Sequence, residues 1–292
     1  MNLYQKPPRS LPFIQQLCII FGGITQIMGW IFFSFGSLFM GIFGFLSAPI
    51  VEPSTEKWET VQGVIQKTEA TSSSENKVRI YKITSTYLYK GVTHQNISYS
   101  KGNRLSVGQS ISIKINPDNP SKSIAEGLRT QPFSGFTLLF ILPFPLVGLM
   151  MILINVKRNL KARNLLLFGE VTRGILKEKR PTGSSITINN RRYPIYHYIF
   201  EFEYMGKTHN AHGKTHKGWL VEDEAQEKIL FNPVSPEESV IYDAVPAMPK
   251  VDAQGNMVVP PKYYGNLILP IIGIMMFVFV VIPVLMKSLG LS

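Results

Sequence analysis

Charged residues divide this chain into polar parts and strictly apolar parts. Asp, Glu, Lys and Arg are absent from three stretches, residues 10–51, 130–156 and 263–286. A helix needs about 20 apolar residues to cross a bilayer, and each of these stretches is longer than that. The pattern therefore predicts membrane segments at residues 11–50, 133–156 and 267–286.

The first two segments each leave an alternative open. Residues 11–50 are too many for one upright helix. They predict either one tilted, kinked helix with an interfacial portion or a tight hairpin of two short helices. In the second segment, Pro143 and Pro145 remove backbone donors that lipid cannot replace. We expect a kink at these prolines, and a re-entrant loop is the alternative.

Between the apolar segments, the pattern changes to alternation of apolar and polar positions. Residues 196–204 carry an aromatic side chain at every second position, and residues 111–115 carry isoleucine at every second position. Such alternation predicts strands with one face on a core and one toward water. Gly91 and Gly206 lie where these strands must turn, which predicts a hairpin at each. Turn-forming residues at 72–76 and 181–185 predict two further turns.

The two polar parts also repeat one another. INPDNPSKSI closes the first part and FNPVSPEESV closes the second. The shared motif NPxxPxxS consists of Asn116, Pro117, Pro120 and Ser123 in one part and Asn232, Pro233, Pro236 and Ser239 in the other. Proline cannot donate to a sheet, and Asn and Ser bond to neighbouring backbone. We interpret the motif as a structural strand terminator rather than a ligand site.

These patterns predict a mixed fold. About three transmembrane α-helices are combined with two small, mainly antiparallel β modules, each barrel-like or sandwich-like. The expected order is an N-terminal membrane segment, the first β module, a transmembrane segment, the second β module and a C-terminal transmembrane segment. The corresponding boundaries are residues 1–50, 51–131, 132–156, 157–264 and 265–292.

The repeated pattern resembles a bacterial family of membrane proteins known as domain of unknown function 3592. In the first module it rests on Trp58, Val61, Gly63, Ile65, Tyr87, Tyr89, Gly91, Gly108, Ile111, Ile113 and the NPxxPxxS motif. The second module keeps Gly174, Tyr204, Gly206, Ile229 and the motif, but it lacks the tryptophan and carries an acidic VEDEAQE segment before its last strand. The resemblance implies a bacterial membrane protein and carries no activity.

The distribution of basic residues predicts an orientation. Lys157, Arg158, Lys161 and Arg163 directly follow the second apolar segment, and Lys6 and Arg9 precede the first. Lys and Arg beside spanning helices mark the cytoplasmic side. The N-terminus and the second β module are therefore expected in the cytoplasm and the first β module outside, in a multi-pass protein of the bacterial cell membrane. Anionic lipid accounts for the basic balance better than nucleic acid does.

Few residues point to chemistry. His209, His212 and His216 lie close together in sequence and are the candidate metal ligands, as imidazoles bind zinc or copper. Their spacing is loose, and a solvated loop is the simpler interpretation. The acidic run of Glu222, Asp223, Glu224 and Glu227 does not fit a calcium-binding loop, and a solvated polar helix or loop is the simpler interpretation. The sequence predicts no catalytic residues, no cofactor and no intramembrane charge that would mark a transport path.

The function that we expect is therefore non-enzymatic. The duplicated modules suggest a membrane-anchored binding or scaffolding protein, or an accessory subunit that contacts the lipid bilayer and other membrane or envelope proteins or a second copy. The alternative is a metal-dependent membrane enzyme or sensor that uses His209, His212 and His216.

Overall fold

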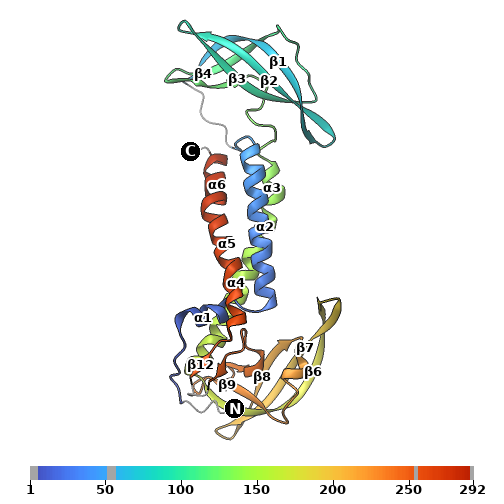
Figure 1. The fold of residues 1–292 in the computed structure, drawn as a ribbon, viewed down its shortest axis with the longest axis vertical. Helices are drawn as coiled ribbons and strands as arrows, with labels where there is room; N and C mark the ends of the chain where they lie inside the picture. The colour runs from blue at the N-terminus through green and yellow to red at the C-terminus, as the bar shows by residue number, and fades with distance from the viewer. Residues whose placement is uncertain (1–5, 51–56, 253–255, 290–292) are drawn as a thin grey trace. The chain divides into compact units, whose positions relative to one another are not determined.

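The computed structural model describes residues 6–50, 57–252 and 256–289. The chain divides into two compact units. One unit comprises Met1–Ile31 and Val147–Ile272, and the other comprises Phe32–Leu146 and Gly273–Ser292. Each unit holds one five-stranded β sheet together with parts of the helices (Figure 1). The predicted start of the first β module, residue 51, lies outside the described residues.

Within the described residues, three helical segments are long and apolar enough to cross a membrane: Ile24–Leu46, Thr137–Phe168 and Pro261–Ser288. The first apolar stretch contains one such helix, α2 (Ile24–Leu46), preceded by the short helix α1 (Phe13–Ile20). Of the two alternatives for residues 11–50, the structure therefore fits one spanning-length helix with a short additional portion better than a hairpin of two spanning helices. One helix takes enough residues for a span, and α1 is too short for one at 1.5 Å per residue.

The prolines interrupt the spanning segments locally. Helix α3 (Thr137–Ile141) is followed directly by α4 (Pro143–Phe168), and Leu142 between them keeps right-handed helical backbone angles. Because Pro143 and Pro145 donate no hydrogen bond, the regular helix breaks at this point. The helical path nevertheless continues to Phe168, so the backbone does not turn back as a re-entrant loop would.

The third segment contains a similar local adjustment. It consists of the 3₁₀ turn η3 (Pro261–Leu267), helix α5 (Ile268–Met276), the π turn η4 (Phe277–Val281) and helix α6 (Ile282–Ser288). Pro283 cannot donate to the carbonyl group four residues earlier. The π turn lies immediately before this proline, where such bulges accommodate a missing bond.

The first β module is one antiparallel, five-stranded sheet in the order β3-β2-β1-β4-β5. Its strands are β1 (Glu59–Glu75), β2 (Val78–Tyr89), β3 (Val92–Lys101), β4 (Ser110–Asn116) and β5 (Asn119–Ala125). Ile113 and Ile115 are buried together with Tyr87 and Tyr89, and Ile111 packs against them. The predicted isoleucine face of β4 is thus confirmed.

The second β module has the order β8-β7-β6-β9-β10, the same order as the first sheet counted along the chain. Its strands are β6 (Glu170–Ile188), β7 (Arg191–Tyr204), β8 (Lys207–Thr215), β9 (Glu227–Phe231) and β10 (Ser239–Ile241). Tyr198, Phe200 and Phe202 are buried in its core, which confirms the predicted aromatic face. The turns η1 (Gly218–Leu220) and η2 (Tyr242–Ala244) and the short pair β11 (Lys250–Val251) and β12 (Met257–Val258) complete this unit.

Two hairpins occur where the glycines predict them. Lys90 and Gly91 connect β2 to β3, and Met205 and Gly206 connect β7 to β8. All four residues have positive φ angles between 47° and 81°. Two successive positive φ angles define the tight turn that matches strand twist. An added Cβ at either glycine would contact nothing within 4 Å, so the requirement is conformational.

Of the two turns predicted at residues 72–76 and 181–185, the first overlaps the observed turn at Asn76 and the second is wrong in position. Both stretches lie mainly inside long strands, as irregularities of β1 and β6, and the chain reverses at Asn76–Lys77 and Asn189–Asn190. Thr71 and Thr182 stabilise these two irregularities in the same way. Each hydroxyl group donates to a carbonyl group of the next strand, that of Ile80 or Ile195, at 2.8 Å.

The NPxxPxxS motif ends a strand and begins the next one. The side-chain oxygen of Asn116 accepts from the Asp118 amide, and that of Asn232 accepts from the Val234 amide. This turn closes the β4–β5 hairpin in one module and lies between β9 and β10 in the other. The structural interpretation of Asn116, Pro117, Asn232 and Pro233 agrees with this placement.

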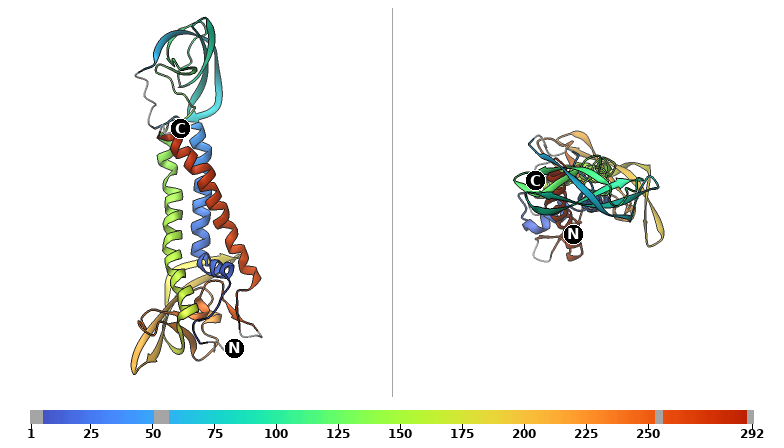
Figure 2. Two further views of the ribbon diagram at one scale, coloured as in Figure 1. Left: turned by 90° about the vertical axis from the view of Figure 1, so that its left-hand side faces the viewer. Right: turned by 90° about the horizontal axis from the view of Figure 1, so that it is seen from above.

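The last serine of the motif connects the two ends of each sheet. In the first module, the Asn96 side chain on β3 donates to Ser123 on β5, to its carbonyl oxygen at 3.0 Å and to its Oγ at 2.9 Å. In the second, Ser239 Oγ on β10 donates to the Asn210 carbonyl oxygen on β8 at 3.4 Å. The edge strands of each curled sheet therefore approach one another without forming a closed barrel (Figure 2).

Candidate functional site

The three candidate histidines lie on or next to strand β8 rather than in a loop. His209 and His212 are both in β8 and His216 follows it. Because side chains alternate along a strand, positions three apart point to opposite faces. His209 accordingly stacks near Phe202 on the core side, with ring centroids 5.6 Å apart. In the first module, His94 stacks on Tyr87 at the same separation, so this position packs against an aromatic ring in both sheets.

His212 and His216 have separate partners. The Nδ1 atom of His212 lies 3.3 Å from Nε2 of His197 on the neighbouring strand β7. The His216 ring lies against Trp219, at 6.3 Å between centroids. Across residues 6–50, 57–252 and 256–289, no three His, Cys, Asp or Glu side chains are grouped so that they could hold a metal ion. The structure does not bring His209, His212 and His216 together.

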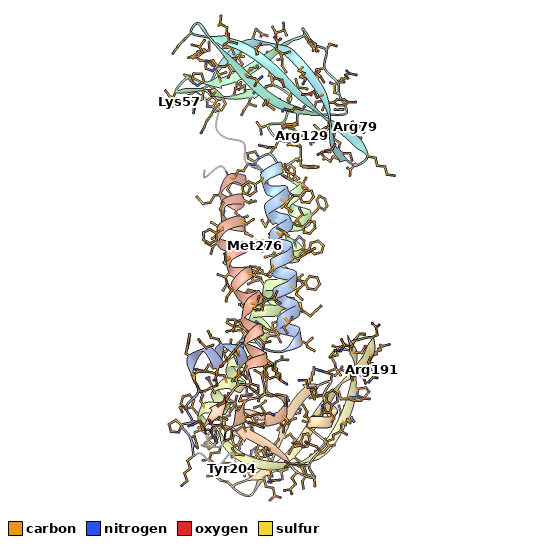
Figure 3. All side chains as sticks on the ribbon, in the orientation of Figure 1. Lys57, Arg79, Arg129, Arg191, Tyr204 and Met276 are labelled. Carbon is orange, nitrogen blue, oxygen red and sulfur yellow. The ribbon has the colours of Figure 1, made fainter. Side chains whose placement is uncertain are left out.

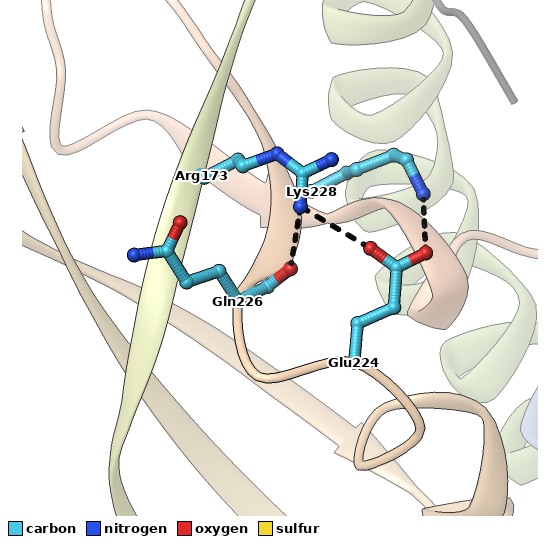
Figure 4. Close-up of polar contacts among 4 residues, drawn as sticks. All are labelled: Arg173, Glu224, Gln226 and Lys228. Carbon is cyan, nitrogen blue, oxygen red and sulfur yellow. Dashed lines mark hydrogen bonds and ion pairs between the residues drawn. The ribbon is translucent and has the colours of Figure 1, made fainter.

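The acidic run before β9 is engaged in ion pairs. Glu224 accepts from Lys228 at 3.2 Å and pairs with Arg173 at 3.3 Å (Figure 4). Glu222 accepts from Lys179 at 2.6 Å and from the Tyr198 hydroxyl group. These contacts attach the loop between β8 and β9 to strands β6 and β7. The carboxylates therefore hold the loop in place.

Glu227 differs from the rest of the acidic run because it is buried. Its side chain is only 1% exposed, at the start of β9. Burial, with the nearby Asp243 and Asp223 carboxylates, raises the pKa of Glu227 to about 7. The sequence expectation of a solvated acidic segment is wrong for this residue. Its neighbours Lys228 and Ile229 belong to a strand that is buried on both faces, which the charge pattern alone did not indicate.

Glu227→Gln should stabilise the second module at alkaline pH. The folded-state pKa is raised above the unfolded value, so the folded state binds more protons than the unfolded state between about pH 4.5 and 7. The native glutamate therefore loses stability as the pH rises through this window. Glutamine should raise the free energy of unfolding by on the order of 2 kcal/mol at pH 8 and change it little at pH 4.5. Thermal unfolding of the purified protein at both pH values measures this difference. An equal effect at both would contradict it.

A cleft lies between the basic end of α4 and the β8 strand. Its volume is about 390 Å³, and its lining includes Arg158, Lys161, His197, His212 and Lys214. A neighbouring opening of about 580 Å³ shares Arg158 and Lys214 with it. Together these two openings are called the basic cleft. The sequence places Arg158 and Lys161 beside a membrane segment, but it does not show that Lys214 from a distant strand joins them.

Polar side chains of α1 and α4 hold the N-terminal segment next to the basic part of α4. Gln16 Oε1 accepts from Arg163 of α4, and Gln15 Oε1 accepts from the Val259 amide. The side chain of Asn159 donates to the carbonyl oxygens of Ile20 and Gly22, at 2.9 and 3.0 Å. The turn before α2 is thereby fixed next to the basic part of α4.

Comparison of the chain with known protein families, with curated proteins and with solved structures finds no match.

Proposed function

We propose that this chain is a multi-pass membrane protein with a non-enzymatic binding, scaffolding or accessory role. Three spans in succession would place the N-terminus and the second β module in the cytoplasm and the first β module outside. The support for this orientation is the cluster of Lys157, Arg158, Lys161 and Arg163 in the last turns of α4. The resemblance to the domain of unknown function 3592 family, and with it a bacterial inner membrane, is part of the same proposal.

The observation that carries the proposal is the shared architecture of the two sheets. They have the same strand order, and the matched residues make the same local structures. Thr71 and Thr182 bond across an irregular strand in the same way, and Ser123 and Ser239 join the sheet ends. Such matches support a duplicated, sandwich-like module. In these matched contacts, the shared residues hold strands together.

The most suitable contact surfaces are hairpin ends rather than strand edges. The approach of the edge strands in each sheet leaves less room for an added strand. At the turns containing Gly91 and Gly206, by contrast, large apolar side chains are exposed: Leu88 is 64%, Val92 56% and Met205 83% exposed. Exposed apolar groups of this kind favour contact with another protein. The opposite hairpin ends carry Arg79 and Arg191 (Figure 3), and their apolar side chains are less exposed, Val78 at 39% and Ile188 at 42%.

Site-specific photo-crosslinking in cells tests this proposal. A photoreactive residue at Val92 or Lys207, the first positions of β3 and β8, should form a crosslink of defined mass to a partner or a second copy. Val78 and Arg191 are matched controls, because each is the first residue of a strand at the other end of its hairpin. A protein that remains monomeric and uncrosslinked at all four positions would argue against a binding role.

The alternative of a metal-dependent enzyme or sensor has less support. It needs His209, His212 and His216 to converge, and they occupy different faces and different surroundings. Only His197 and His212 have ring nitrogens within hydrogen-bonding distance among the described histidines.

A further inference from the structure

The basic cleft contains cations that have no carboxylate partner. Arg158, Lys161 and Lys214 form no ion pair within the described ranges. The cations on β6 and β9 behave differently. Each is paired with a glutamate: Arg173 and Lys228 with Glu224, Lys177 with Glu201, Lys179 with Glu222 and Arg180 with Glu178. The cleft thus gathers three cations without an ion pair, unlike the cations of β6 and β9.

The carboxylates near the cleft do not neutralise these cations. Glu237 lines the smaller opening and Asp243 lines the larger one. Asp243 is engaged with the buried Glu227, and burial raises the pKa of Asp243. Glu237 has no ion pair within 4 Å among the described residues. An anion in the cleft would therefore contact three free cations and meet one exposed carboxylate. The His197 and His212 rings add hydrogen-bonding groups to the same wall.

The larger opening also has an apolar side. Ile24 and Ile27 of the first turns of α2 contribute to its lining, together with Ile186 and Ile195 of the β6–β7 hairpin. Ile24 is the first residue of a helix long enough to span a membrane. The opening thus combines cations with apolar side chains at the beginning of a spanning helix. A ligand that fits both features carries an anionic group and a hydrocarbon part.

We propose that the basic cleft binds the phosphate group of an anionic phospholipid, with Arg158 and Lys214 as the principal contacts. This inference rests on the proposed function, because it needs the start of α2 to lie at the membrane boundary. Arginine binds phosphate oxygens through two parallel hydrogen bonds, and lysine does so as a point charge. Basic pockets next to spanning helices bind phospholipid head groups in this manner. The glycerol part and acyl chains would follow Ile24 and Ile27 toward the bilayer.

Lipid titration of the full chain in detergent tests the cleft. The purified, delipidated protein is titrated with short-chain phosphatidylglycerol, short-chain phosphatidylcholine and glycerol phosphate, each in separate calorimetric experiments. We expect phosphatidylglycerol to bind most tightly. The double variant Arg158→Gln/Lys214→Gln should weaken this binding about 10-fold or more, because two charge-assisted contacts are lost. Both side chains are exposed, so the variant should melt at the same temperature as the parent protein.

A charge-matched control separates the cleft from general attraction. Lys207→Gln/Lys250→Gln removes the same two charges from exposed positions outside both openings, and it should leave lipid binding unchanged. Equal weakening by the two double variants would overturn the proposal. Glycerol phosphate that binds as tightly as the lipid would also overturn it and would indicate a soluble phosphate compound. Extraction of the protein from membranes by alkaline carbonate would refute the proposed function itself. Retention in the membrane without a preference for phosphatidylglycerol would refute only the lipid site.

Discussion

Gly36→Leu should strongly destabilise the helical part of its unit. In α2, an added Cβ at Gly36 would lie 2.6 Å from both the nitrogen and Cδ of Pro145, and 3.1 Å from the carbonyl carbon of Phe144. These are atoms of backbone and of a rigid ring, so they cannot rotate away as a flexible side chain does. Small residues permit such close approach of helices in membranes. Overpacking costs 1–3 kcal/mol or more, and we expect a loss of about 3 kcal/mol for a whole leucine side chain.

The measurement is the melting temperature and the yield of monodisperse protein in mild detergent. Gly265→Leu is the matched control, because an added Cβ there meets nothing within 4 Å and Gly265 has no positive φ angle. Gly44→Leu should resemble Gly36→Leu, since its Cβ would lie 2.1 Å from Cγ1 of Val284 in α6. Unchanged stability of both Gly36→Leu and Gly44→Leu would mean that α2 does not pack against these neighbours as described.

Arg9→Leu should destabilise the unit that contains the second module. Arg9 is 5% exposed, and its guanidinium group donates to the carbonyl oxygens of Leu166 and Gly169 at 2.9 and 2.8 Å. These carbonyl groups lie at the end of α4, where helical partners are lacking. Hydrogen bonds of charged donors contribute about 1.5–3 kcal/mol each. Leucine leaves both acceptors buried without this donor, so we expect the free energy of unfolding to fall by about 3 kcal/mol.

Lys6→Leu is the control for Arg9→Leu. It removes the same charge three residues earlier, and Lys6 is exposed. Urea unfolding followed by tryptophan fluorescence should show a loss for Arg9→Leu alone. If both variants lose stability equally, the hydrogen bonds that Arg9 donates to the end of α4 do not explain the effect. The loss would then follow from the effect of N-terminal charge on membrane insertion.

The three apolar segments could be predicted from the sequence because charged side chains are unfavourable in lipid, so a spanning segment contains few or none of them. The end of the second helix could not be predicted from the charge pattern. The charge pattern ends it at Val156, whereas α4 continues to Phe168. Residues 157–168 are rich in Lys, Arg and Leu, which are strong helix formers. The start of the charges marks the end of the apolar part and not the end of the helix, although helix propensity could have indicated the continuation.

The histidine cluster shows where sequence proximity misleads. The hairpin at Gly206 fixes the start of β8, and alternation along that strand already separates His209 from His212. This signal was present in the sequence. The contact of His212 with His197, by contrast, comes from the pairing of β8 with β7. Arg158 and Lys214 line one cleft because a helix packs near a sheet. Contacts between distant segments depend on register and strand order, which one sequence does not record.

Cysteine accessibility tests the central claim that the two modules face opposite sides of a membrane. The single native cysteine is buried in the second-module unit and is first replaced by Cys18→Ser. Thr93→Cys and Thr208→Cys then place one exposed cysteine next to the matched hairpin turn of each module. A membrane-impermeant maleimide added to intact cells should label Thr93→Cys only, and Thr208→Cys should become reactive once the membrane is opened. Labelling of both positions in intact cells, or of neither until the membrane is opened, would contradict the account.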